Sequence, residues 1–176
     1  MLLVVMILAT AMMSPLAAFG AVVTLAVLYQ ILDCTDGTLA RAKGLSSIQG
    51  QYWDLVADVI YRGIAYTAVG YVCDQLSPWP GALSQATILA LSAWLAVVAR
   101  LARLNIERLT PPSAPAAQGP RFTAFSFLSG LDTVFPLLAV LAWATNSLNG
   151  FVLWIFIYSL GDVVSALQEA RGKLHP

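Results

Sequence analysis

Residues 1–32, MLLVVMILATAMMSPLAAFGAVVTLAVLYQIL, decide the fold, because this whole stretch carries no charged side chain. Two further uncharged runs cover residues 75–99 and 133–161. A helix needs about 20 consecutive apolar residues to cross the hydrocarbon core of a bilayer, so each run is long enough to form a membrane helix. Of the 176 residues, 59% are hydrophobic and 10% are charged, a composition that excludes an ordinary soluble domain.

Proline, glycine, serine and asparagine residues interrupt the apolar runs and predict where the helices end. We expect an all-α integral membrane protein, formed by residues 1–176 as a single domain, with a bundle of six transmembrane helices. The expected spans are 1–14, 16–40, 48–73, 83–108, 122–145 and 150–170. Because residues 1–32 are too few for two complete crossings and a turn, we expect the first helix to be truncated in this sequence.

The cationic residues that flank the expected spans gather on one side of the membrane. If neighbouring spans alternate in direction, that side holds Arg41, Lys43, Arg108, Arg121, Arg171 and Lys173. The loops on the other side, 74–82 and 146–149, contain no Lys or Arg. The positive-inside rule therefore predicts that the first side is cytoplasmic. Nine basic and nine acidic residues balance over the chain, which argues against nucleic-acid binding.

Four aspartates lie at the cytoplasmic ends of two consecutive expected spans. Asp33 and Asp36 are three residues apart, and Asp54 and Asp58 are four apart, so each pair shares one face of its helix. A short turn joins the two helices, and we expect the four carboxylates to converge. They cannot all stay ionised together without a counter-charge. Two divalent cations would balance them, and oxygen-only ligands favour Mg²⁺ or Mn²⁺.

Small residues beside the aspartates favour the binding of a phosphorylated ligand. Gly37 and Ala40 lie on or beside the face of the first aspartate pair, where they let a diphosphate approach the helix backbone. Arg41 is placed to bind a phosphate oxygen, and Gly50 lets the two helices come close. The alternatives are that the aspartates pair with arginines or cap helix ends, or that the chain is a membrane carrier that uses them to bind a cation.

Residues 33–58 resemble, without a gap or substitution, the signature of the CDP-alcohol phosphotransferases: D-x-x-D-G-x-x-A-R, eight residues, then G-x-x-x-D-x-x-x-D. The resemblance implies a six-helix membrane enzyme that moves a phosphatidyl or similar group from a CDP-linked lipid to a hydroxyl acceptor and releases CMP. It implies that Asp33, Asp36 and Asp54 are metal ligands, and that Asp58 is both a further ligand and the catalytic general base.

The same resemblance places the nucleotide and diphosphate against Asp36, Gly37, Ala40, Arg41 and Gly50. It also implies a homodimer in a bacterial cytoplasmic membrane, with the active site and the C-terminus facing the cytoplasm. One departure concerns the first helix, where family members usually carry polar residues and this chain begins Met1-Leu-Leu-Val-Val-Met. Truncation explains it best; altered cytidine recognition and an inactive homologue are the alternatives.

Three arginines are candidates for binding the acceptor, namely Arg62, Arg100 and Arg103. The alternative is that they form ion pairs or extend toward the lipid headgroups. The run from Arg100 to Asn105 is similar to a stretch of bacterial phosphatidylserine synthases of this family, which implies serine as the acceptor, followed by inositol phosphate or glycerol phosphate. Asp132 and Asp162 lie inside expected spans, where we expect structural ion pairs with the arginines.

Overall fold

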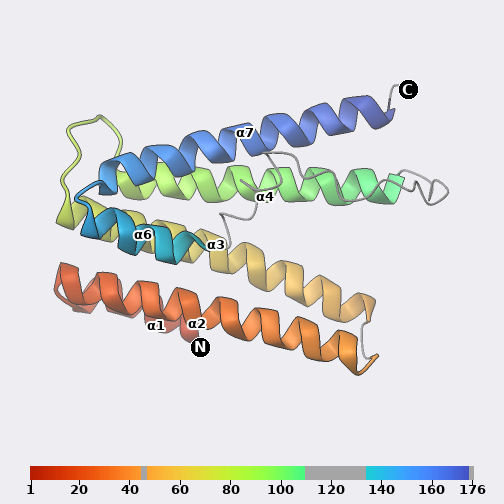
Figure 1. Cartoon of the computed structure of the whole chain (residues 1–176), viewed down its shortest axis with the longest axis horizontal. Helices are drawn as coiled ribbons and strands as arrows, with labels where there is room; N and C mark the ends of the chain where they lie inside the picture. Colours follow the sequence, from red (N-terminus) through yellow and green to blue (C-terminus); the bar gives the residue numbers. More distant parts are fainter. Residues whose placement is uncertain (45–46, 110–133, 175–176) are drawn as a thin grey trace.

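A computed structural model describes residues 1–44, 47–109 and 134–174 of the chain (Figure 1). These residues form six helices and no strand, as the composition predicts. The helices are α1 (Leu2–Met12), α2 (Pro15–Ala42), α3 (Ile48–Leu76), α4 (Gln85–Leu109), α6 (Phe135–Ala144) and α7 (Leu148–Leu174).

Four helices are long and apolar enough to cross a membrane: Pro15–Leu39, Ile48–Leu76, Gln85–Ile106 and Leu148–Gly172. Helices α1 and α6 are also apolar, but with 11 and 10 residues they are shorter than a full crossing. The prediction of a helical membrane protein is therefore supported, whereas six complete spans are not confirmed. Residues 122–133, the first half of the expected span 122–145, lie outside the described residues.

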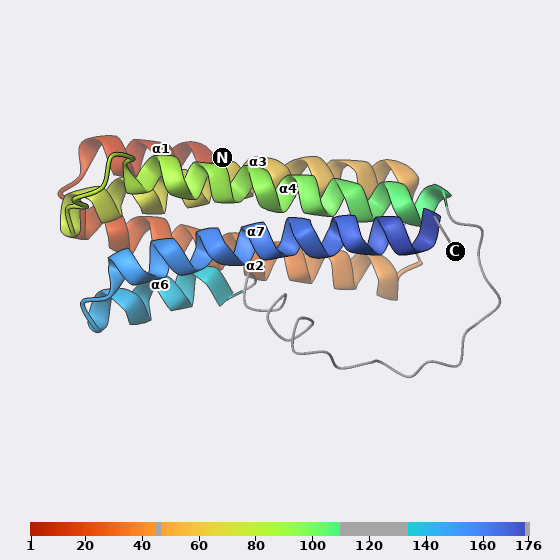
Figure 2. The same ribbon diagram turned by 90° about the horizontal axis from the view of Figure 1, so that it is seen from above.

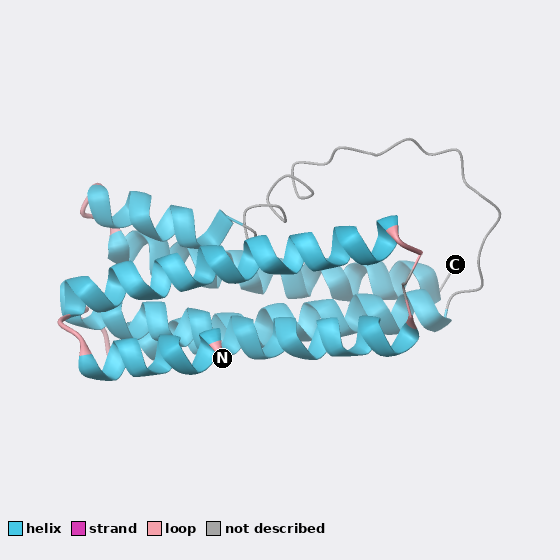
Figure 3. Cartoon of the chain, turned by 90° about the horizontal axis from the view of Figure 1, so that it is seen from below, coloured by secondary structure: helices cyan, strands magenta, loops and turns pink. Residues whose placement is uncertain are grey.

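The helices pack in two rows, with α1, α3 and α4 in one and α2, α6 and α7 in the other (Figure 2). Their directions alternate. The turn between α2 and α3 and the C-terminal ends of α4 and α7 lie at one end of the bundle (Figures 1 and 3). The turns between α1 and α2, α3 and α4, and α6 and α7 lie at the other end. The ends of α2, α4 and α7 that carry or precede the expected cationic residues therefore lie at a single end of the bundle, while the connection 110–121 with Arg121 lies outside the described residues.

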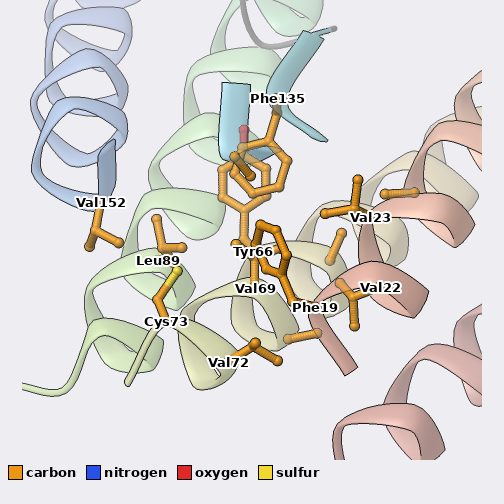
Figure 4. Close-up of a cluster of buried hydrophobic side chains, with 14 of the residues drawn as sticks. Phe19, Val22, Val23, Tyr66, Val69, Val72, Cys73, Leu89, Phe135 and Val152 are labelled. Atoms are coloured by element: carbon orange, nitrogen blue, oxygen red, sulfur yellow. The ribbon is translucent and has the colours of Figure 1, made fainter. Parts of the chain in front are cut away.

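Aromatic and branched side chains from both rows fill the core. Figure 4 shows Phe19 of α2, Tyr66 of α3 and Phe135 of α6 in one buried cluster, in which the rings of Tyr66 and Phe135 stack. Large apolar side chains also cover the outside, among them Trp94, which is 68% exposed. A soluble protein rarely exposes so much apolar surface, and lipid is the environment that such a surface fits.

Two contacts hold the junction between α3 and α4: a side-chain cap and a close approach of the two backbones. The carboxylate of Asp74 accepts hydrogen bonds from the N–H groups of Gln85 and Ala86 at 2.8 and 3.1 Å, so it caps the N-terminus of α4. A Cβ atom on Gly70 would lie 2.6 Å from the Cα of Ala86. Only glycine permits this approach, which sets the distance between the two helices that flank the candidate site.

A buried ion pair joins α4 to α7. Arg103 donates to both carboxylate oxygens of Asp162, at 2.6 and 3.3 Å, and also to its backbone carbonyl. Asp162 is only 8% exposed whereas the Arg103 side chain is 32% exposed, so the bidentate contact compensates mainly for the burial of the carboxylate. The prediction of a structural pair is confirmed for Asp162, while Asp132 lies outside the described residues.

Candidate active site

A pocket of about 210 Å³ opens between α2, α3, α4 and α6. Its polar wall combines three of the four signature carboxylates with two of the three candidate arginines. The residues that line it are Tyr29, Gln30, Asp33, Cys34, Asp54, Asp58, Tyr61, Arg62, Tyr66, Arg100 and Phe135. Helix α2 supplies the first four, α3 the next five, and α4 and α6 one each. We call this space the arginine pocket.

A second pocket of about 500 Å³ lies on the other side of the same carboxylates, against α1, α2 and α3. Asp36 and Gly50 line this pocket and not the first, together with the apolar side chains of Leu32 and Trp53. We call it the signature pocket. Asp33 and Asp54 line both pockets, and their carboxyl groups lie in contact with each other. Tyr29 also lines both pockets, so these two carboxylates and the tyrosine beside them form a wall that the two pockets share.

Asp58 is held by two arginines within the arginine pocket. Arg62, one turn further along α3, approaches Oδ2 of Asp58 with its Nε at 3.4 Å. Arg100 reaches across from α4 and contacts the same oxygen with Nη1. The Asp58 side chain is 16% exposed, against 22% for Arg62 and 38% for Arg100. The carboxylate is thus the most enclosed member of the trio, and both guanidinium groups reach the pocket.

The sequence predicted that the four carboxylates converge on one point. In the structure they are instead divided between two adjoining pockets. Among the described residues, no three carboxylate, thiol or imidazole side chains gather closely enough to hold a metal ion. Like charges repel, and Asp58 is drawn toward its two arginines. Asp33, Asp36 and Asp54 form no ion pair within the described chain and offer only oxygen ligands, a donor set that suits Mg²⁺ or Mn²⁺.

The predicted nucleotide residues fall only partly within what the structure describes. Gly37 follows Asp36 on α2 but is not among the residues that line the signature pocket. Ala40 and Arg41 belong to α2, but their side chains lie outside the described part. Gly50 donates its N–H to Oγ of Ser47, the cap of α3, and a Cβ there would lie 3.2 Å from that oxygen. Its nearest contact is therefore the cap, rather than the neighbouring helix.

Aromatic pairs that the sequence analysis missed frame the arginine pocket. The rings of Tyr29 and Tyr61 stack with centroids 4.0 Å apart, and Tyr66 stacks on Phe135 at 4.2 Å. The first pair fixes α2 against α3 and the second fixes α3 against α6. Tyr29 lies four residues before Asp33, and Tyr61 lies three after Asp58. Residues one helical turn before Asp33 and one turn after Asp58 lie on the same helix faces as the aspartates. Considering those positions would have identified both tyrosines.

Arg103, the third acceptor candidate, does not line the arginine pocket. Its guanidinium faces α7, where it binds Asp162 and lies 4.0 Å from a carboxylate oxygen of Glu169. The structure thus brings two of the three candidate arginines together with Asp58 and directs the third into the contact between α4 and α7.

A comparison with protein families identifies one family. The model of the family described as CDP-alcohol phosphatidyltransferase matches residues 1–161, which include both pockets and end one residue before Asp162. No curated protein and no solved structure matches the chain.

Proposed function

Because the chain belongs to the CDP-alcohol phosphatidyltransferase family, we propose that it transfers a phosphatidyl group from a CDP-linked lipid to a hydroxyl group of a small polar acceptor, with release of CMP. The observation that supports this proposal is the wall formed by Asp33 and Asp54. One side of that wall offers space and carboxylates for a nucleotide diphosphate, and the other offers cations and a carboxylate for an acceptor. A transferase needs two such sites that meet at the reacting phosphorus.

The donor occupies the signature pocket in this proposal. Asp36 and Gly50 line it, Gly37, Ala40 and Arg41 follow along α2, and all five would contact the nucleotide or diphosphate. Leu32 and Trp53 provide apolar surface beside the carboxylates, which suits a donor that is also a lipid. The lipid portion would enter from the bilayer.

Asp33, Asp36 and Asp54, with Asp58 as a further ligand, would hold two divalent cations, Mg²⁺ or Mn²⁺. Bound cations would neutralise the diphosphate and the charge that develops on CMP as it leaves. The protein's own contribution is to orient the donor and to accept a proton. The acceptor oxygen attacks the β-phosphorus, the bond from that phosphorus to the CMP oxygen breaks with its electrons remaining on CMP, and Asp58 takes the hydroxyl proton.

The acceptor occupies the arginine pocket, with serine, inositol phosphate and glycerol phosphate as the candidates. Arg62 and Arg100 are the residues placed to contact it. The exposed Lys43 and Arg171 lie near the end of the bundle that carries the site, so the positive-inside rule supports a cytoplasmic site and C-terminus in a bacterial membrane. We retain the homodimer as a prediction.

The direct test is CMP release from CDP-diacylglycerol by the purified protein in the presence of Mg²⁺ or Mn²⁺, with each acceptor in turn. Asp58→Asn should retain donor binding and stop CMP release, because the amide keeps the size of the side chain but is not a base. Asp74→Asn is the matched control. It is the same substitution at the far end of the same helix, outside both pockets; its amide oxygen can still accept from Gln85 while the bond from Ala86 is lost, so it controls for a loss of stability without a change in the site.

Undiminished CMP release by Asp58→Asn would remove Asp58 from the base role. An inactive homologue would bind the donor and release no CMP with any acceptor. A cation carrier would bind metal ions without binding the donor.

A further inference from the structure

We infer that Tyr29 is a catalytic residue whose hydroxyl group donates a hydrogen bond to an oxygen on the β-phosphorus of the donor, the phosphorus that is transferred. The inference rests on the proposed function and adds to it a residue outside the signature, which begins at Asp33. Tyr29 stays protonated throughout. It supplies a hydrogen bond and takes no part in the movement of the hydroxyl proton to Asp58.

Tyr29 lies where the two pockets meet. Among the described residues, three line both the arginine pocket and the signature pocket, namely Tyr29, Asp33 and Asp54. In the proposed reaction the donor and the acceptor approach each other across these three residues, so the phosphorus under attack lies beside them. Residues that serve one substrate are expected to line one pocket, as Asp36 and Arg100 do.

Tyr29 is also the member of this group that can donate a hydrogen bond. The ionised carboxylates of Asp33 and Asp54 only accept, so they can hold a phosphoryl group only through a bound cation. A phenol is neutral and donates directly to an anionic oxygen. The phosphoryl oxygens carry negative charge throughout the transfer, and a donor fixed beside them stabilises that charge.

The hydroxyl group of Tyr29 is available to a ligand. The residue is half-buried, and its hydroxyl forms no hydrogen bond within the described chain. The charges of Asp33, Asp54 and Arg100 act on the phenol, which places it near groups from both sides of the wall. Phenylalanine would pack equally well at this position, so helix packing alone does not explain the hydroxyl.

The ring of Tyr29 is held in a fixed position. It stacks on Tyr61 of α3 with the ring centroids 4.0 Å apart and the planes 5° from parallel. Tyr61 in turn donates a buried hydrogen bond to the backbone carbonyl of Ala26 at 3.4 Å. Because Ala26 lies three residues before Tyr29, this bond holds the second ring against the same face of α2. The phenol is therefore oriented before a substrate binds, as electrostatic catalysis requires.

The first experiment compares the equilibrium binding of CDP and CMP to the purified full chain with Mg²⁺ or Mn²⁺ present. CDP carries the β-phosphate and CMP lacks it, so the difference in affinity isolates this group. We expect Tyr29→Phe to weaken CDP binding roughly tenfold or more, the contribution of one hydrogen bond to a charged group, and to leave CMP binding unchanged. Phenylalanine keeps the ring that stacks on Tyr61.

The second experiment measures CMP release from CDP-diacylglycerol by the same variant. The kcat should fall roughly 100-fold or more, which is the usual effect of removing one fixed donor to a reacting group, while the KM for the acceptor stays unchanged. Tyr71→Phe is the matched control, because Tyr71 is exposed on α3 and lines neither pocket. Both variants should unfold at the temperature of the unaltered protein, since each keeps its ring.

CDP binding or a kcat that is unchanged by Tyr29→Phe would overturn the inference. Equal weakening of CDP and CMP binding would also overturn it, because Tyr29 would then act on the nucleoside or on the fold. A raised KM for the acceptor would assign the hydroxyl to the acceptor instead. These results would leave the proposed function standing, whereas failure of the unaltered protein to bind either nucleotide, or to release CMP with any acceptor, would contradict the proposed function itself.

Discussion

Substitution of Gly70 by alanine should test whether the backbone contact between α3 and α4 holds the site together. The added Cβ would lie 2.6 Å from Cα of Ala86, 2.7 Å from the carbonyl oxygen of Gln85 and 2.9 Å from the nitrogen of Ala86. All three are backbone atoms, so no side-chain rotation relieves the overlap. Ordinary contact begins at 3.4 Å, which requires the start of α4 to move by about 0.8 Å.

Two effects should add in Gly70→Ala. Overpacking of this kind destabilises a protein by about 1–3 kcal/mol. The movement also stretches the hydrogen bonds of 2.8 and 3.1 Å by which Asp74 caps α4, and a lost N-terminal cap contributes about 0.5–2 kcal/mol more. Gly63→Ala is the matched control on the same helix, because a Cβ there meets nothing within 4 Å. Alanine should stabilise that position slightly.

The assay follows thermal unfolding in detergent through the reaction of Cys73 with a thiol-specific dye. Cys73 is fully buried and should react only on unfolding, whereas Cys34 is exposed and is first replaced by serine. We expect Gly70→Ala to unfold several degrees below Gly63→Ala, at roughly 2–4 °C per kcal/mol. Equal unfolding temperatures for the two variants would show that the close contact does not constrain the bundle.

Two further predictions concern the buried ion pair and the metal ions. Asp162→Asn removes the main carboxylate partner of Arg103, whose side chain is 32% exposed, and should destabilise the protein by about 1–3 kcal/mol. Arg103→Leu combined with Asp162→Leu should recover most of this loss; an equally low unfolding temperature for the double variant would contradict the pairing. Chelation with EDTA should abolish CMP release and added Mg²⁺ or Mn²⁺ should restore it, and activity that persists in EDTA would exclude a divalent cation from the reaction.

The helices could be predicted from the sequence because a chain in lipid must satisfy its backbone hydrogen bonds within each segment. Uncharged runs therefore indicated helices, and turn residues located their ends to within a few positions. Helix α2 begins at Pro15, for instance, where residue 16 was expected, and α4 begins at Gln85, where residue 83 was expected. The number of full crossings was less predictable, since α1 and α6 are as apolar as the longer helices but shorter.

The site was predictable where it depended on helical periodicity and less so where it depended on neighbouring helices. The spacing of the aspartates led us to expect one cluster, whereas Asp33, Asp36 and Asp54 line one pocket between α2 and α3 and Asp58 lines the adjoining pocket. Arg100 and Arg103 are also three apart, yet they bind different helices. Three residues turn an α-helix by about 300°, which leaves the two side chains about 60° apart. That difference is enough to direct one toward α3 and the other toward α7.

Asp74 anchors the start of α4 at Gln85 and Ala86. A change in length should therefore have different effects in the connection before this anchor and in the part of α4 that follows it. Residues 77–84 connect α3 to α4; Ser77 bonds Asn149 and Gln85, and Ser84 caps Thr87. Only the exposed residues 80–83 between them can therefore be lengthened or shortened while Gln85 and Ala86 stay anchored. Beyond the anchor, one inserted residue before Arg100 would rotate its side chain by about 100° around the helix, away from Asp58. Natural relatives should therefore vary in the connection and keep a constant count of residues from the anchor to the arginine.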